Sequence, residues 1–394
     1  MKYDFDKIIE RRATGALKYD ALEERYGDPD LLPLWVADMD FATPPFILEA
    51  LQKTLDQKIL GYTVVSKELP KAIIDWNSYL HNWKIKREWL NFIPGIVKGI
   101  GYVINLFTLP GDKIIIQPPV YHPFRMVPEG NERQVVTNPL IATKDGYEMN
   151  LTHLEELTSD PKCKLLILSN PHNPAGIVWP IETLRKVADI CQRNNVIVIS
   201  DEIHSDMVLW GGSHHPFPTV SEEAADCSIT FAAPSKTFNI AGVVSAYSVV
   251  INPELRNRFY SWMDANEFSE PTIFTPPATI AAFTQGKEWR LQMLGYVESN
   301  IEFLIEFFKE QIPLIRPMKP GASFLVWLDC RKLGLSHDEL IHLFVDKARL
   351  ALNDGEMFGP GGEGFMRINV AAPRKILEIA LERLRDAVNS LDQK

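Results

Sequence analysis

The eleven residues AAPSKTFNIAG, from Ala232 to Gly242, put a lysine at the end of a strand. They continue the apolar run CSITFA (residues 227–232), which is typical of a buried strand. Lys236 therefore lies where the strand gives way to a loop that ends in glycine. Partial desolvation beside a packed sheet lowers the pKa of an amine and makes it a nucleophile towards carbonyl groups. Taken alone, Lys236 fits an ordinary solvated lysine better.

The middle of the chain alternates short apolar runs with amphipathic segments of helical length. One helix is predicted in PIETLRKVADICQRN (residues 180–194). Strands are predicted in DKIIIQPP (112–119), KLLILSN (164–170), VIVISDEIH (196–204) and CSITFAAPSK (227–236). This alternation predicts an α/β fold with a mostly parallel central sheet and helices on both faces. Such sheets bind ligands at the carboxyl ends of their strands, where the polar residues of these segments fall.

The pattern changes after about residue 287. A long helical segment (288–311) precedes GASFLVWLDC (321–330), GFMRINVAA (364–372) and a terminal helix, which predicts a smaller α+β domain. The first 45 residues precede the regular alternation and are assigned to this domain. We therefore predict a large α/β domain over residues 46–287 and a small α+β domain formed by residues 1–45 and 288–394.

Composition limits the classes of partner. The net charge of −10 argues against nucleic acid, and the sequence has neither a secretory signal pattern nor an apolar run of membrane-spanning length. The four cysteines form no CxxC pair, which is typical of reduced thiols. We expect a cytoplasmic protein that acts on small molecules, without nucleic acid or membrane partners.

Two patterns resemble other kinds of site and are set aside. GPGGEG (residues 359–364) satisfies G-x-G-x-x-G but precedes a predicted strand, whereas a dinucleotide-binding loop follows one. His204, Asp206, His214 and His215 lack the helical spacing of zinc enzymes. The first is interpreted as a turn, and no metal site is predicted.

Asp201 and Asn173 complete a set with Lys236. Asp201 ends the buried run VIVIS, where a carboxylate needs a cationic partner or strong hydrogen bonds. Alone, Asp201 suits an ion pair or a helix cap, and Asn173 suits a proline-rich turn. Together the three residues fit pyridoxal phosphate, whose aldehyde reacts with lysine, whose protonated ring nitrogen pairs with an acid, and whose ring oxygen accepts from an amide.

Three motifs in this order and spacing resemble the class I/II aminotransferase family of fold-type I pyridoxal phosphate enzymes: SNPHNPAG (169–176), SDEIH (200–204) and SKTFNIAG (235–242). WVADMDF (35–41), LGYTVVSKEL (60–69) and PPVYHPF (118–124) are similar to the cystathionine β-lyase, or C–S lyase, subgroup. The likeness covers nearly the whole chain. It implies the aspartate aminotransferase-like fold, an amino-acid substrate, and a homodimer with shared active sites.

The resemblance also implies roles for single residues. Tyr121 would be catalytic with Lys236 and Asp201, stacking on the pyridine ring, and Tyr62 would reach the phosphate bound by the neighbouring subunit. Backbone N–H groups at a helix start would bind the phosphate. The implied cofactor contacts are Lys236, Asp201, Asn173, Tyr121, His204, Ser235, Ile96, Val97 and Tyr62.

Arg367 would hold the substrate carboxylate as a bidentate fork, with Ala37, Asp38 and Tyr62 as further substrate contacts. Taken singly, Arg367 is more typical of a surface arginine on an edge strand, and Tyr62 suits a core or a surface position.

Two positions depart from most aminotransferases of the family. His204 stands where tyrosine is usual, and Val244 stands where an arginine usually pairs with the phosphate. The lyase subgroup resembles this chain in lacking that arginine, so the phosphate would depend on the helix start, on Ser235 and on the partner chain. Lys98 could offset the missing charge, although its place one turn into a helix also suits a solvated side chain.

Three functions remain open. The resemblance favours α,β-elimination of a thiol from cystathionine or another cysteine S-conjugate, giving pyruvate and ammonia. Transamination would use the same residues up to removal of the Cα proton. A protein of this fold that acts mainly by binding a partner protein is the third hypothesis, and the intact set of Lys236, Asp201, Asn173 and Arg367 speaks against lost catalysis.

Overall fold

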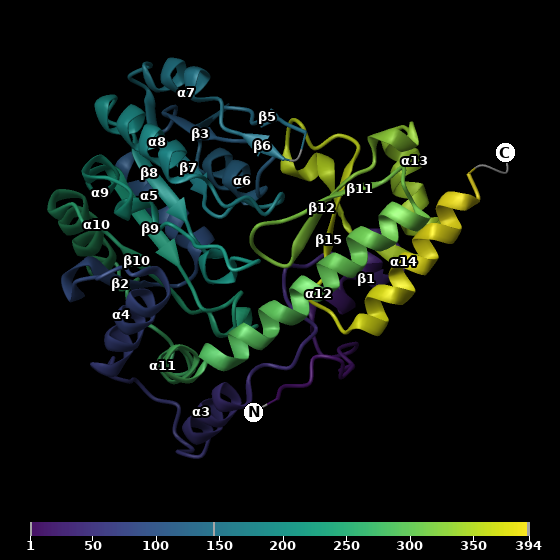
Figure 1. Cartoon of the computed structure of the whole chain (residues 1–394). Coiled ribbons are helices and arrows are strands. Elements are labelled where there is room, and N and C mark those ends of the chain that lie inside the picture. Colours follow the sequence, from purple (N-terminus) through teal and green to yellow (C-terminus); the bar gives the residue numbers. More distant parts are fainter. Residues whose placement is uncertain (1, 145, 392–394) are drawn as a thin grey trace.

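The computed structural model describes residues 2–144 and 146–391, which fold around a seven-stranded and a four-stranded sheet (Figure 1). The larger sheet has the order β2-β10-β9-β8-β7-β3-β4, in which β10 alone runs antiparallel. Its strands are β2 (Leu90–Ile93), β3 (Lys113–Ile116), β4 (Gln134–Thr137), β7 (Cys163–Ser169), β8 (Ile197–Asp201), β9 (Ser228–Ala232) and β10 (Ala246–Val249).

Helices cover both faces of this sheet because its central strands are apolar on both sides. In β7, Leu165 and Ile167 face one core, while Leu166 and Leu168 face the other. The first core is closed by α5 (Ile96–Phe107), α6 (Pro123–Gly130) and α10 (Pro253–Ala265). The second is closed by α7 (Leu151–Thr158), α8 (Ile181–Arg193) and α9 (Glu222–Cys227).

The smaller sheet has the order β11-β12-β15-β14 and packs against α12 and α14, which lie side by side (Figure 1). Its strands are β11 (Arg316–Met318), β12 (Leu325–Asp329), β14 (Asn353–Asp354) and β15 (Phe365–Asn369). The helices of this part are α12 (Lys287–Gln311), α13 (His337–His342) and α14 (Arg374–Asn389). The remaining elements are α1 (Leu17–Asp20), α2 (Leu22–Tyr26), α3 (Pro45–Leu55), α4 (Glu68–His81), α11 (Thr275–Gln285), β1 (Leu32–Pro33), β5 (Ile141–Ala142), β6 (Tyr147–Glu148) and β13 (Leu350–Ala351).

The predicted α/β class, with a mostly parallel sheet between two layers of helices, is confirmed. The strand expected over 196–204 ends earlier, at Asp201, because the chain turns there into the loop that carries His204. The division of the chain at residues 45/46 and 287/288 stays a prediction. None of the helices in the described ranges combines the length and the apolar character that crossing a bilayer requires.

Gly176, in the loop after β7, packs against the loop between β11 and β12 so closely that no side chain fits there. Its φ of +66° is left-handed, and a Cβ there would lie 2.4 Å from Pro320 Cβ and 2.7 Å from the Ala322 carbonyl oxygen. The Gly176 carbonyl accepts hydrogen bonds from the backbone N–H groups of Gly321 (2.8 Å) and Ala322 (3.0 Å). The turn that carries Asn173 is thereby fixed against the segment leading into the smaller sheet.

Gly176→Ala should therefore destabilise the fold by about 3 kcal/mol, because left-handed strain adds to overpacking. Gly15→Ala is the matched control, since Gly15 has a similar φ of +77° but open space around its Cα. The control should cost only about 1 kcal/mol. Urea unfolding of both variants measures the difference, and equal losses would contradict the close packing described here.

Candidate functional site

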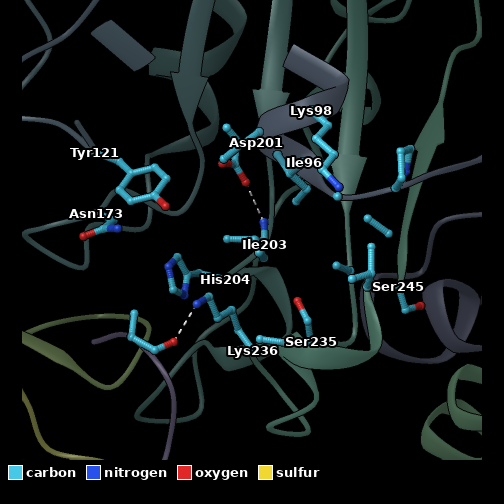
Figure 2. Close-up of a pocket in the computed structure, with 18 of the residues that line it drawn as sticks. Ile96, Lys98, Tyr121, Asn173, Asp201, Ile203, His204, Ser235, Lys236 and Ser245 are labelled. Atoms are coloured by element: carbon cyan, nitrogen blue, oxygen red, sulfur yellow. Dashed lines mark hydrogen bonds between the residues drawn. The ribbon is translucent and has the colours of Figure 1, made fainter. Parts of the chain in front are cut away.

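A cavity of about 320 Å³ lies at the carboxyl ends of β7, β8 and β9 (Figure 2). Segments far apart in the sequence meet there. They are the N-terminal segment at Ala37, the start of α5, and the loops that follow the three strands. The lining includes Ala37, Ile96, Val97, Lys98, Tyr121, Ser169, Asn173, Asp201, Ile203, His204, Ser235, Lys236, Val244 and Ser245. Most of the residues predicted from sequence are thus brought together.

The Lys236 amine points into this cavity and donates a hydrogen bond to the Ala37 carbonyl oxygen at 2.5 Å (Figure 2). Burial lowers the pKa of Lys236 to about 8, and the positive charge of Arg367 acts in the same direction. The carboxylates of Asp38 and Asp201 oppose this change. About a tenth of the amine is therefore unprotonated at pH 7, far more than for an ordinary lysine, and this is the form that acts as a nucleophile or a general base.

Asp201 is the last residue of β8, and its side chain is buried. One carboxyl oxygen accepts a hydrogen bond from the Ile203 backbone N–H at 3.1 Å. Burial raises the pKa of Asp201 to about 7, and the neighbouring Glu202 carboxylate adds to the rise. Within the described ranges no lysine, arginine or histidine forms an ion pair with Asp201. A buried carboxyl that lacks a cation fits a ligand with a protonated ring nitrogen.

Asn173 and Arg367 connect the cavity to the smaller sheet. The Asn173 side-chain oxygen accepts from Arg367 Nη1 at 2.9 Å, although Arg367 lies in β15 and does not line the cavity itself. Arg367 Nη2 donates to the Trp35 carbonyl oxygen at 3.2 Å and to the side-chain oxygen of Asn353. Arg367 Nε is buried without a partner among the residues described. An N–H group left over in this way suits an incoming carboxylate.

The start of α5 forms another part of the wall. Its N-cap residue, Gly95, has a φ of +113°, and Ile96 and Val97 open the helix. The first N–H groups of a helix have no partners within it, and the helix dipole attracts anions to this end. Lys98 is exposed at the rim and also lines the cavity, while Ser235 lies on the opposite wall (Figure 2). This end of the cavity suits a phosphate group.

Tyr121 and His204 both line the cavity (Figure 2). Burial raises the pKa of Tyr121, so its hydroxyl keeps its proton. Burial lowers the pKa of His204 to about 3, with Lys236 and Arg367 acting in the same direction. His204 is therefore a neutral hydrogen-bonding group, and its Nδ1 has no partner in the described part of the chain.

Besides Arg367, two further predicted residues lie outside the cavity lining. Tyr62 is fully exposed in the segment between α3 and α4. The Asp38 carboxylate pairs with Arg11 at 2.7 Å and lies 3.8 Å from Lys18 Nζ. The roles of Tyr62 and Asp38 therefore stay predictions.

Ser169, Ile203 and Ser245 line the cavity and were not singled out from the sequence. Ser169 ends β7 and Ile203 follows β8, so their position at strand ends was the available signal. Ser245 follows the short helical turn Ala241–Val243 and belongs to no motif. No group of three or more His, Cys, Asp or Glu side chains suited to a metal ion occurs in the described ranges.

The raised pKa of Asp201 makes the stability of the cofactor-free protein depend on pH. Between about pH 4 and pH 7 the folded chain holds a proton that the unfolded chain has lost, so stability falls as the pH rises through this window. Asp201→Asn removes this effect and should stabilise the cofactor-free protein by about 2–4 kcal/mol at pH 8, but by little at pH 4. Urea unfolding at both pH values measures the gain. Glu382→Gln, at an exposed carboxyl of α14, should show no such dependence.

Comparisons with known proteins agree with this geometry. The family model of class I and II aminotransferases matches residues 29–384. The chain is 40% identical to cystathionine β-lyase PatB of Bacillus subtilis, over 98% of this chain and 100% of that protein. It is 32% identical to MalY of Escherichia coli, over 99% and 100%. The structure of cystalysin from Treponema denticola, which contains pyridoxal 5'-phosphate, matches with a TM-score of 0.95 at 35% identity, over 99% of this chain and 100% of that one. The predicted aspartate aminotransferase-like fold is confirmed, and the chain belongs to the class I and II aminotransferase family.

Proposed function

We propose that this chain is a pyridoxal-phosphate-dependent C–S β-lyase that eliminates a thiol from cystathionine or a related cysteine S-conjugate. The observation that carries the proposal is a desolvated lysine amine and a buried, unpaired carboxyl in one cavity. The relatives support the same assignment, since PatB is named a cystathionine β-lyase and cystalysin contains the cofactor.

The residues present fit the cofactor. Lys236 would take its aldehyde, Asp201 would face its ring nitrogen, and Tyr121 would lie against its ring. The start of α5 and Ser235 would hold its phosphate. When bound, pyridoxal phosphate supplies an electron-withdrawing ring that stabilises negative charge at the substrate Cα.

Three side chains of the protein take separate roles in the reaction. Lys236, with its lowered pKa, takes the Cα proton as general base. Asp201 holds the proton on the ring nitrogen, and Arg367 binds the substrate carboxylate through its spare N–H groups. The C–S bond at Cβ breaks with its electron pair going to sulfur. The thiolate takes up a proton and leaves as a thiol. The released aminoacrylate is hydrolysed by one water molecule to pyruvate and ammonia.

Transamination is the second candidate, and the family match favours it. It shares the proton removal by Lys236 but returns the proton to the cofactor carbon. A transaminase therefore consumes a keto acid in each full cycle, whereas a lyase needs none. The requirement for a keto acid separates the two reactions in solution.

The purified chain, loaded with cofactor, should release pyruvate and free thiol from L-cystathionine without added keto acid. Lys236→Ala removes the general base and should lower the rate by at least about a thousandfold. Pyruvate and thiol assays measure both proteins. Lys186→Ala, a partly exposed lysine on α8 away from the cavity, is the control and should leave the rate unchanged.

Turnover that depends on an added keto acid would instead identify a transaminase. A cofactor-loaded protein that turns over neither kind of substrate would contradict both assignments and favour the partner-binding hypothesis.

We infer that the active unit is a homodimer. The segment between α3 and α4 exposes a run of apolar side chains that a monomer would leave in water. Tyr62 in this run is fully exposed, so a contact with phosphate requires the cavity of a second copy. The exposed side chains are Ile59, Leu60, Tyr62, Val64 and Val65. The four buried, free cysteines support a cytoplasmic location, because a reducing compartment keeps thiols in this state.

Shared sites can be tested by mixing two inactive variants, Tyr62→Ala and Lys236→Ala. A hybrid dimer carries both defects in one site and neither in the other. An equimolar mixture that exchanges subunits freely should recover about a quarter of the wild-type activity, since half of the dimers are hybrids with one intact site. Activity that stays at the level of the separate variants would contradict a site completed by Tyr62 of a second copy.

A further inference from the structure

Glu202 lies next to Asp201 but faces the opposite side of the sheet end. Its carboxylate is buried and is fixed by hydrogen bonds from Ser200 Oγ (3.0 Å) and the Phe217 backbone N–H (2.7 Å). The third contact is His214 Nε2, at 2.7 Å. Glu202 and Ser200 lie in the motif SDEIH (200–204), but the resemblance gives neither residue a role. This set of donors suits a carboxylate, whose oxygens only accept hydrogen bonds.

His214 leaves the charge of Glu202 uncancelled. Its side chain is fully buried, and burial lowers the pKa of His214 although the Glu202 carboxylate opposes the change. His214 Nδ1 has no partner among the described residues, so a second proton there would be a buried, unpaired donor. The neutral ring therefore donates Nε2–H to Glu202 and carries no positive charge.

The polar groups around His214 bind one another, and no hydrogen bond joins them to Glu202 in the described part of the chain. The His81 ring of α4 packs edge-on against His214 at 5.3 Å, and His81 Nε2 lies 3.0 Å from an Asp206 carboxyl oxygen. Arg290 of α12 donates to the main-chain oxygen of Asp206. The Tyr247 hydroxyl of β10 is neutral, because burial raises its pKa. Within the described residues, no lysine or arginine forms an ion pair with Glu202.

We propose that Glu202 is a positioning residue that acts through Asp201. Glu202 places a fixed negative charge on the far side of β8, and this charge helps the site to hold a proton at Asp201 or at the group that Asp201 faces. The consequence for the cofactor rests on the proposed function. Two adjacent carboxylates stabilise a proton in the cavity better than one does, so Glu202 helps Asp201 to keep the cofactor ring nitrogen protonated. In cofactor-free protein the same charge favours the protonated form of Asp201 itself, where it adds to the effect of burial.

Glu202→Gln tests this coupling, because the amide keeps the shape of the side chain and an acceptor for Phe217 while removing the charge. In cofactor-free protein, infrared difference spectroscopy follows the ionisation of Asp201, with Asp201→Asn assigning the band. The midpoint should fall by roughly one pH unit in Glu202→Gln. In the holoenzyme, NMR of isotope-labelled cofactor should show the ring nitrogen losing its proton at a correspondingly lower pH.

Two control variants separate charge from hydrogen bonding. Ser200→Ala removes one donor to Glu202 but leaves its charge, and His214→Gln keeps a donor that cannot become cationic. Both should lower stability slightly and leave the Asp201 midpoint in place. A purely structural role of Glu202 would lower the stability of all three variants and move the midpoint in none of them.

An unchanged Asp201 midpoint in folded Glu202→Gln would overturn the proposal. Should that variant fail to fold, the double variant Glu202→Gln/His214→Gln keeps a hydrogen-bonded amide pair without charge, and the same fall is expected. The cofactor-free measurement needs neither cofactor nor substrate. A wild-type protein that binds no cofactor would therefore refute the proposed function while the coupling between Glu202 and Asp201 is still measured.

Discussion

The site depends on the burial of two ionisable groups, Asp201 and Lys236. They lie at and just beyond the ends of two neighbouring parallel strands. Asp201 ends β8 and pairs in register with Phe231 of β9, and the chain reaches Lys236 only a few residues later. Burial raises the pKa of the acid to about 7 and lowers that of the amine to about 8. Each group is therefore within about one pH unit of its titration midpoint near neutral pH, as an acid or base that works at this pH requires.

The smaller sheet is part of the same electrostatic arrangement. Arg367 in β15 is almost wholly buried, and an unpaired guanidinium there would be strongly destabilising. Its two terminal nitrogens donate to Asn173 from the loop after β7, to Asn353 from β14 and to the Trp35 carbonyl of the N-terminal segment. Three separate parts of the chain must therefore pack correctly before Arg367 can be buried. Formation of the proposed substrate-carboxylate site is thus tied to the packing of the two sheets against each other.

The sequence predicts the central strands of the larger sheet better than it predicts which charged side chains are buried. Apolar runs without polar alternation identify β3, β7, β8 and β9, because strands covered on both faces need no polar side. The short strands β2 and β10 carry too weak a pattern to be recognised. Lys18 and Glu202 are buried charges whose partners, Asp40 and His214, lie far away in the sequence. Nothing local distinguishes such residues from solvated ones, so only the fold reveals them. Motif residues such as Asn173 were accessible because their spacing is itself the signal.

The absence of an arginine at position 244 would make the proposed phosphate site depend on assembly. Val244 lines the cavity with a left-handed φ of +56°, a strained conformation for a β-branched residue, and contributes no charge. A phosphate at the start of α5 is then balanced by helix N–H groups, by the Ser235 hydroxyl and by Lys98, whose ammonium is exposed and screened. These groups compensate a dianion less fully than a buried guanidinium would. The proposed contribution of Tyr62 from a second copy then supplies part of the phosphate affinity, and by mass action whatever favours the dimer also favours the loaded site.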